Sequence, residues 1–87
     1  MRKTCTAGEV TEFAFDKSVM EYRVKNFTDS DILVTHKDEF VESEASKIKS
    51  MHGEDFNVCD FDYQAKRLTV KVKVEKEGEV EVSLVRF

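Results

Sequence analysis

Residues 67–87 alternate between apolar and polar side chains on both sides of a single glycine, Gly78. An alternation of period two is typical of a β-strand that buries one face. A loop at residues 76–78 would set the two apolar runs opposite one another and place Gly78 at the left-handed position that such a loop requires. A slip by one residue would bury charged side chains instead. The chosen register predicts three cross-strand pairs: Val74 with Val80, Val72 with Val82, and Val70 with Leu84.

Three other segments predict strands from their side-chain patterns. Residues 11–15 and 20–25 both alternate, and a turn at Lys17-Ser18 would join them in a second hairpin. The β-branched run Ile32–Val34 predicts a short strand. Residues 1–9 are expected to form either a flexible arm or a short edge strand.

Residues 55–62 are expected to form a further strand that returns through a tight turn at Gln64-Ala65 and pairs with residues 68–74. This pairing places Cys59 and Phe61 in the core, and a β-bulge would reverse that assignment. The opposite face of the sheet then carries an aromatic and an apolar side chain beside two lysines. These residues are Phe56, Val58, Lys71 and Lys73.

A helix is predicted over residues 37–52. Thr35 is a candidate N-cap, because Asp38 stands at the third helical position and completes a capping box. Gly53 supplies a signal for the C-terminal end. One apolar stripe follows helical spacing. Its members are Phe40, Val41, Ala45, Ile48 and Met51.

The predicted elements follow the order β-β-β-α-β-β-β. Local hairpins of this kind build an antiparallel sheet, here of five or six strands, with the helix packed on its apolar face. A chain of 87 residues has the size of one domain. The sequence therefore predicts a single α+β domain that spans residues 1–87.

Motifs for common enzyme chemistry and metal binding are absent from the sequence. There is no phosphate-binding loop, no glycine-rich dinucleotide turn and no GxSxG. His36 and His52 would flank the predicted helix about 24 Å apart, too far to share one metal ion. With Cys59 in the core, a Cys59–His52 nucleophile pair is disfavoured. We expect no cofactor, no metal site and no enzymatic activity.

The chain carries no signal for a membrane. No apolar run approaches the roughly 18 residues of a spanning helix, and residues 4–9, which follow the basic start, are not the apolar core of a signal peptide. These features predict a cytoplasmic protein. Cys5 and Cys59 are then expected to be free thiols, with an internal disulfide as the alternative.

Acidic residues are concentrated in the middle of the chain. Residues 29–62 hold ten acids against Lys37, Lys47 and Lys49, which gives a formal charge of −7, whereas the whole chain carries −4. Such a segment repels phosphate backbones and attracts basic proteins. We therefore expect a protein partner with a basic surface that itself binds nucleic acid, and we do not expect this chain to bind nucleic acid directly.

The preferred interaction site is the polar face of the predicted helix, together with the turn that precedes residues 32–34. The acids on these two elements would attract the partner over a distance and speed association. The candidate residues are Asp29, Asp31, Asp38, Glu39, Glu42 and Glu44. The alternative for the helix acids is a solvated surface without a partner.

Two other functions remain open. Phe56 and Val58, beside Lys71 and Lys73, would form a sheet surface on which single-stranded RNA can stack. The protein is alternatively a structural subunit, a homodimer built by pairing of sheet edges.

The order of elements also resembles a known group of proteins. A strand at Glu21–Phe27, a short turn, a strand at Ile32–Thr35, a capped helix and a hairpin are similar to the plan of small phage and mobile-element proteins, including some anti-CRISPR proteins. The resemblance extends from residue 21 to residue 74, matches no sequence motif and transfers no functional residue. It implies a compact, non-enzymatic inhibitor that binds a host or defence complex in the host cytoplasm.

Overall fold

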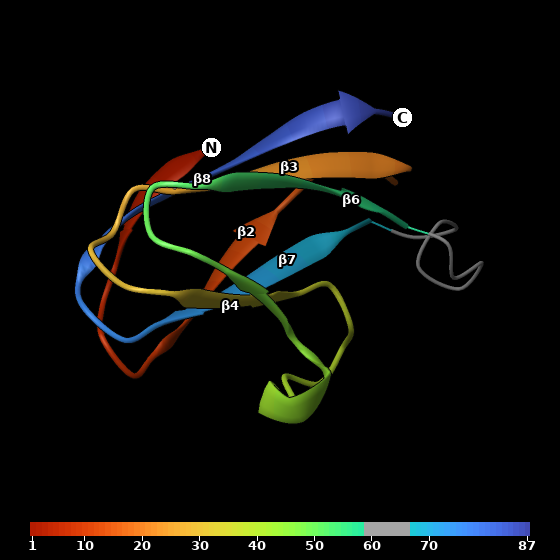
Figure 1. Cartoon of the computed structure of the whole chain (residues 1–87). Coiled ribbons are helices and arrows are strands. Elements are labelled where there is room, and N and C mark those ends of the chain that lie inside the picture. Colours follow the sequence, from red (N-terminus) through yellow and green to blue (C-terminus); the bar gives the residue numbers. More distant parts are fainter. Residues whose placement is uncertain (59–66) are drawn as a thin grey trace.

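The computed structural model describes residues 1–58 and 67–87, and its described residues form a two-layered β-sandwich (Figure 1). Sheet A has the strand order β1-β8-β3-β6, and sheet B has the order β2-β7-β4-β5. All the pairings are antiparallel. The strands are β1 (Arg2–Cys5), β2 (Val10–Ala14), β3 (Glu21–Asn26), β4 (Ile32–Thr35), β5 (Ser46–Ile48), β6 (Gly53–Asn57), β7 (Thr69–Val74) and β8 (Gly78–Arg86).

The hydrophobic core lies between the two sheets, because alternate residues of each strand point inward. Sheet A contributes Cys5, Tyr22, Val24, Val80 and Val82 to the core. Sheet B contributes Phe13, Ile32, Val34, Ile48, Val70, Val72 and Val74. Each of these side chains is at most 2% exposed. The alternation in the sequence therefore identified the buried face of β2, β3, β7 and β8.

The predicted pairing of the last two strands is wrong. Strand β7 belongs to sheet B and β8 to sheet A, so the loop between them crosses from one layer to the other. Val74 pairs with Ile32, and Val80 pairs with Lys3 and Asn26. A hairpin and a crossing loop bury the same alternate residues, so the alternation alone does not distinguish them.

The other two predicted hairpins are replaced in the same way. Strand β2 pairs with β7, while β3 pairs with β8 and β6. Residues 55–57 therefore lie beside β3 and not beside β7, and the predicted turn at Gln64-Ala65, with Cys59 and Phe61, lies outside the described residues. Among the described strands, β4 and β5 are the one consecutive pair within a sheet. The predicted strand at residues 32–34 is present as β4, and residues 2–5 form an edge strand.

The predicted helix over residues 37–52 is also wrong. The segment contains a loop, a short 3-10 turn η1 (Glu42–Glu44) and β5. Of the five residues in the predicted stripe, only Ile48 is buried, and Met51 is 64% exposed. Because the inner faces of the two sheets cover each other, no apolar sheet face remains to receive a helix. The Thr35 hydroxyl accepts a 3.3 Å hydrogen bond from the Lys37 amide in a turn. The described fold is all-β and not α+β.

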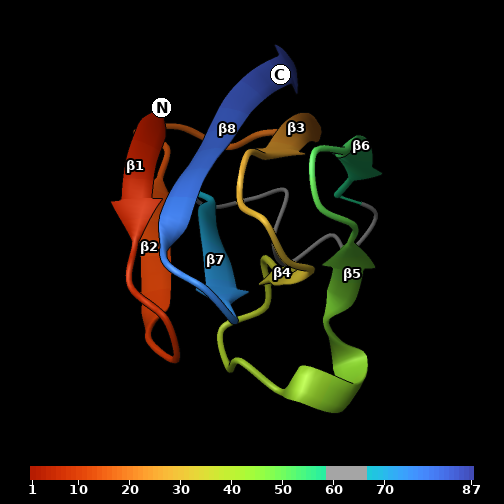
Figure 2. The same ribbon diagram turned by 60° about the vertical axis from the view of Figure 1, so that its left-hand side comes forward.

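The two long sides of the sandwich differ. On the closed side, formed by β1 and β2, the Lys3 ammonium of β1 donates a 2.7 Å hydrogen bond to the Glu12 carbonyl of β2. The Gly8 amide in the connecting turn donates to the Val74 carbonyl at 3.0 Å. On the open side, formed by β5 and β6, no hydrogen bond joins the two strands in the part of the chain that the structure describes. Figure 2 shows β1 and β2 at one side and β5 and β6 at the other.

Candidate functional site

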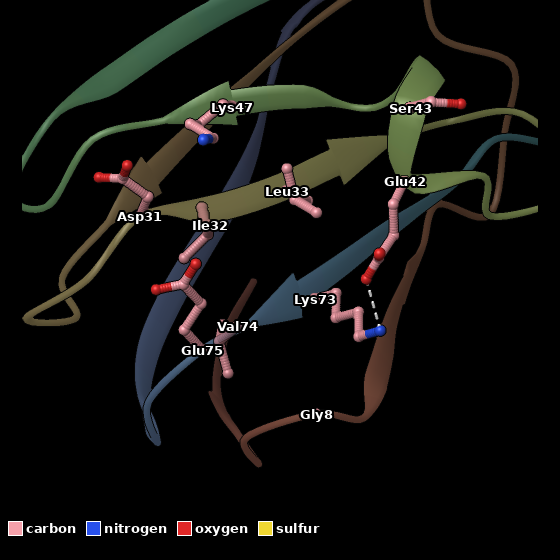
Figure 3. Close-up of a pocket in the computed structure, with 10 residues that line it drawn as sticks. All are labelled: Gly8, Asp31, Ile32, Leu33, Glu42, Ser43, Lys47, Lys73, Val74 and Glu75. Atoms are coloured by element: carbon pink, nitrogen blue, oxygen red, sulfur yellow. Dashed lines mark hydrogen bonds and ion pairs between the residues drawn. The ribbon is translucent and has the colours of Figure 1, made fainter.

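A groove of about 630 Å³ lies on the outer face of sheet B (Figure 3). It extends between the β3–β4 turn and the loop at residues 36–45, which we call the docking loop. Its floor comes from β4 and β7, and Gly8, in the turn between β1 and β2, completes the lining. The lining residues are Gly8, Asp31, Ile32, Leu33, Glu42, Ser43, Lys47, Lys73, Val74 and Glu75.

Leu33 forms the apolar part of the floor. Its neighbours Ile32 and Val34 point into the core, so the strand geometry directs Leu33 to the outer face. Leu33 pairs with Lys47 of β5 on one side and with Lys73 of β7 on the other. A partly exposed leucine thus lies between two lysines on adjacent strands.

The turn at one end of the groove is held by the buried Asn26. Its side-chain amide donates to the carbonyls of Ser30, at 2.8 Å, and Ile48, at 3.2 Å. Its carbonyl oxygen accepts from the amide and the hydroxyl of Thr28. The Ser30 hydroxyl then donates a 2.7 Å hydrogen bond to Glu75. These contacts fix Asp31 and Glu75 at the same end of the groove, as Figure 3 shows.

The docking loop covers the other end of the groove. Glu42 forms a 2.6 Å ion pair with the Lys73 ammonium, and the Lys71 ammonium donates a 2.8 Å hydrogen bond to the Lys37 carbonyl. The Lys73 and Glu42 side chains are 33% and 60% exposed, so the ion pair contributes no more than about 1 kcal/mol. Its main effect is to hold the loop over β7.

The charges that line the groove are not all paired. Asp31, Glu42 and Glu75 oppose Lys47 and Lys73, which gives a formal charge of −1 (three acids against two lysines). Asp31 and Lys47 make no ion pair with any residue that the structure describes. The arrangement offers an anionic end, a cationic edge and an apolar floor to a charged side chain. Within residues 1–58 and 67–87, no group of three or more His, Cys, Asp or Glu side chains is placed to hold a metal.

The structure separates the predicted acidic residues into two groups. Asp29 and Asp31 lie on the β3–β4 turn, and the others lie on the docking loop at the opposite end of β4. Asp31 and Glu42 line the groove, whereas the remaining four side chains are exposed outside it. Those four are Asp29, Asp38, Glu39 and Glu44. Asp29 lies in the predicted turn, whereas Asp38, Glu39 and Glu44 lie on the docking loop and not on the helix face that the sequence predicted.

The alternative surface predicted from Phe56, Val58, Lys71 and Lys73 does not form. Phe56 belongs to sheet A and stacks on Tyr22 with ring centroids 5.3 Å apart, while both lysines belong to sheet B. Val58 is 1% exposed. Tyr22 is itself buried, which raises the pKa of its phenol, and its hydroxyl lies 2.8 Å from Nδ1 of His36. Lys73 of this alternative surface contacts Glu42 of the predicted acidic site, so the groove brings together one residue from each.

Several residues of the groove were not predicted from the sequence. Leu33, Lys47 and Glu75 were not among the candidates, and Gly8 lines the groove from a turn distant in the sequence. One signal for Leu33 was available. A residue whose two neighbours along a strand are buried must itself point to the opposite face of the sheet. The juxtaposition of β4, β5 and β7 had no such signal, because it depends on which strands pair.

Comparison of the chain with models of known protein families, with curated proteins and with solved structures found no match. The resemblance to small phage and mobile-element proteins rested on a helix and hairpins that the structure replaces, so it gives no support to an assignment. In the described part of the chain, no helix is both long enough and apolar enough to cross a membrane.

Proposed function

We propose that this chain is a non-enzymatic binding domain whose groove and docking loop attach to a basic surface of a partner protein. One observation supports the proposal most strongly. The groove holds a carboxylate at each end, Asp31 and Glu42, and a partly exposed apolar residue, Leu33, between them. A lysine or arginine of the partner can bind a carboxylate while its aliphatic stem covers the leucine.

The charge of the docking loop supports the same partner. Residues 36–45 carry four acids and Lys37, which gives a formal charge of −3. Exposed charges of one sign steer a partner of opposite sign and raise the association rate, an effect that salt weakens. The same charge repels phosphate, so a nucleic-acid partner is disfavoured.

The partly buried Leu33 contributes affinity once the partner has docked. Removal of apolar surface from water contributes about 25 cal/mol per Å², and this term does not depend on salt in the way that ion pairs do. The association rate should therefore depend on salt, and the dissociation rate should depend on Leu33. We place this binding in the cytoplasm, where a free thiol such as that of Cys5 persists.

The test compares two variants that remove the same number of charges. The first carries Glu39→Gln, Glu42→Gln and Glu44→Gln in the docking loop. The matched control carries Glu9→Gln, Asp16→Asn and Glu77→Gln, at exposed positions that do not line the groove. Tagged wild-type and variant proteins are incubated with extract of the source cells, and the bound proteins are quantified by mass spectrometry.

We expect a basic protein that binds the wild type and the control but is depleted at least several-fold with the docking-loop variant. A Leu33→Ser variant should lose the same protein through faster dissociation. The proposal is rejected if the bound proteins are the same for the docking-loop variant and the control. Circular dichroism of each variant verifies that the fold is retained.

A further inference from the structure

The two strands of the open side carry opposite charges. Strand β6 holds Glu54 and Asp55, and β5 with the residue after it holds Lys47 and Lys49. Among the described residues, no ion pair connects the acids of β6 with the lysines of β5. Asp55 instead accepts two hydrogen bonds from Arg23 of β3, at 2.6 and 3.1 Å, which lower the pKa of its carboxyl group. The open side therefore places the carboxylate of Glu54, which makes no ion pair with a described residue, beside the two lysines.

The edge of β6 also offers unpaired backbone groups. The Asn26 amide donates to the His52 carbonyl, and the Val58 amide donates to the Met20 carbonyl, both at 2.8 Å. Because bonded pairs alternate along an antiparallel ladder, the even-numbered residues of β6 bond to β3. Gly53, Asp55 and Asn57 then direct their amides and carbonyls away from β3. None of the described residues bonds to these outward groups.

A shallow hollow of about 320 Å³ lies between the two edge strands. It is lined by Lys47, Ile48, Lys49, His52, Gly53 and Glu54. The hollow separates β5 from β6 at this edge of the sandwich. On the closed side, the equivalent position is taken by the Lys3 side chain, which caps the Glu12 carbonyl.

We propose that the open side binds a second copy of the same chain, with β6 of each copy lying along β5 of the other. A twofold axis generates both contacts at once, as in other symmetric dimers. Sheet A of each copy then continues into sheet B of its partner copy. The occupant follows from charge complementarity, because Glu54 of one copy faces the lysines of the other in both contacts. This interface shares Lys47 with the groove, whereas neither Glu54 nor Lys49 lines the groove.

Pairing of β6 with β6 in a dimer is disfavoured by the same charges. It would bring Glu54 and Asp55 of both copies together, and like charges opposite one another destabilise a strand pair. Glu54 also pairs with the buried Val24 and so occupies a position on the inner face of the sheet, although its own side chain is exposed.

The test uses two single charge reversals in the full chain, Glu54→Lys and Lys49→Glu. Lys49 is chosen over Lys47 because Lys47 also lines the groove. In a homodimer of either variant, like charges face one another at both contacts. Each variant alone should therefore dimerise at least about tenfold more weakly than the wild type. An equimolar mixture should form a heterodimer, because one contact then has reversed charges and the other is native. Native mass spectrometry with one variant isotopically labelled distinguishes the three dimers.

Glu77→Lys, an exposed charge reversal outside both strands, is the control and should dimerise like the wild type. A wild-type protein that sediments as a monomer up to millimolar concentration overturns the proposal. So does a mixture of Glu54→Lys with wild type that dimerises more strongly than the mixture of the two reversals, because that result indicates pairing of β6 with β6. Failure of this dimer would leave the groove proposal intact, since the docking-loop variant alters neither edge.

Discussion

The closed and open sides of the sandwich differ in how the backbone groups of their edge strands are covered. Every edge strand exposes backbone groups that another chain can pair with. On the closed side, the Lys3 ammonium caps the Glu12 carbonyl at the edge of β2, where another strand would bind. On the open side, the edge groups of β6 stay exposed and only charges restrict what can pair with them. The capped edge of β2 contrasts with the uncapped edge of β6, and this contrast supports our proposal that the open side binds a second copy of the chain.

The interior does not share this asymmetry. Cys5 on β1 is fully buried, and Ile48 on β5 is 2% exposed. Tyr22, on the strand next to β6, is 1% exposed. The two sides therefore differ in how their edges are covered and not in how their cores are packed, and substitutions at the edges should reveal the contrast.

The largest expected effect compares two glycines that each begin an edge-proximal strand of sheet A. An added Cβ at Gly78, which pairs with Cys5 of the closed side, would lie 2.7 Å from Cγ2 and 3.2 Å from Cα of Thr28. Gly78→Ala should lower the free energy of unfolding by about 1–3 kcal/mol, because the buried Thr28 cannot move freely. Urea denaturation measures the loss.

Gly53→Ala on the open side is the matched control. Its Cβ would lie 3.2 Å from Cγ of Lys25, a flexible side chain, so the change should stay within about 0.5 kcal/mol. Equal losses for the two variants would show that the close approach of Thr28 does not constrain position 78.

A smaller effect is expected from removal of the Lys3 cap. Lys3→Met deletes the hydrogen bond to the Glu12 carbonyl and the ammonium that lies 5.2 Å from the centre of the Phe13 ring. We expect a loss of about 0.5–1.5 kcal/mol in urea, together with self-association detected by light scattering, because the β2 edge becomes exposed. Lys25→Met, which changes an exposed lysine of β3, should produce neither result. A Lys3→Met protein that scatters light like the wild type would show that the cap does not protect the edge.

The smallest effect is a dependence on pH that tests the core beside the open edge. Burial raises the pKa of Tyr22 above its ordinary value of 10.0. Above about pH 10 the unfolded chain therefore releases a proton that the folded chain retains, and the free energy of unfolding falls as the pH rises. Tyr22→Phe should have a flatter decline between pH 10 and 11 than the wild type, in urea titrations at each pH. Parallel slopes would show that the phenol is not buried.

The sequence predicted the buried faces of β2, β3, β7 and β8 well and the strand partners poorly. It was wrong for the segment of β6, where Phe56 and Val58 were assigned to the face away from the core but pack against it. Alternation placed Val70, Val72, Val80 and Val82 in the core, where the structure has them. Alternation depends only on which face of a strand is buried. Two strands joined by a loop that crosses between sheets bury the same residues as the two strands of a hairpin. The pairing of Val72 with Val34 and Thr11 required contacts distant in the sequence.

The helix was predicted incorrectly because local signals agreed on a structure that the rest of the fold does not support. Apolar spacing and a capping residue favoured it, but a helix must bury its stripe, and tertiary packing overrides local preference. Only Ile48 of that stripe reaches the core. The candidate site was predicted in part for the same reason. Asp31, Glu42 and Lys73 were recognised individually, while their meeting across Leu33 depends on the pairing of β4 with β7.

Amide hydrogen exchange as a function of protein concentration tests the contrast between the two sides most directly. Asp55 and Asn57 direct their amides outward from β6, whereas Glu12 lies on the capped edge of β2. If the open side selects a second copy, exchange at Asp55 and Asn57 should slow as the concentration rises, while exchange at Glu12 should not change. Rates at Asp55 and Asn57 that are the same at every concentration, or protection that develops at Glu12 instead, would contradict the account.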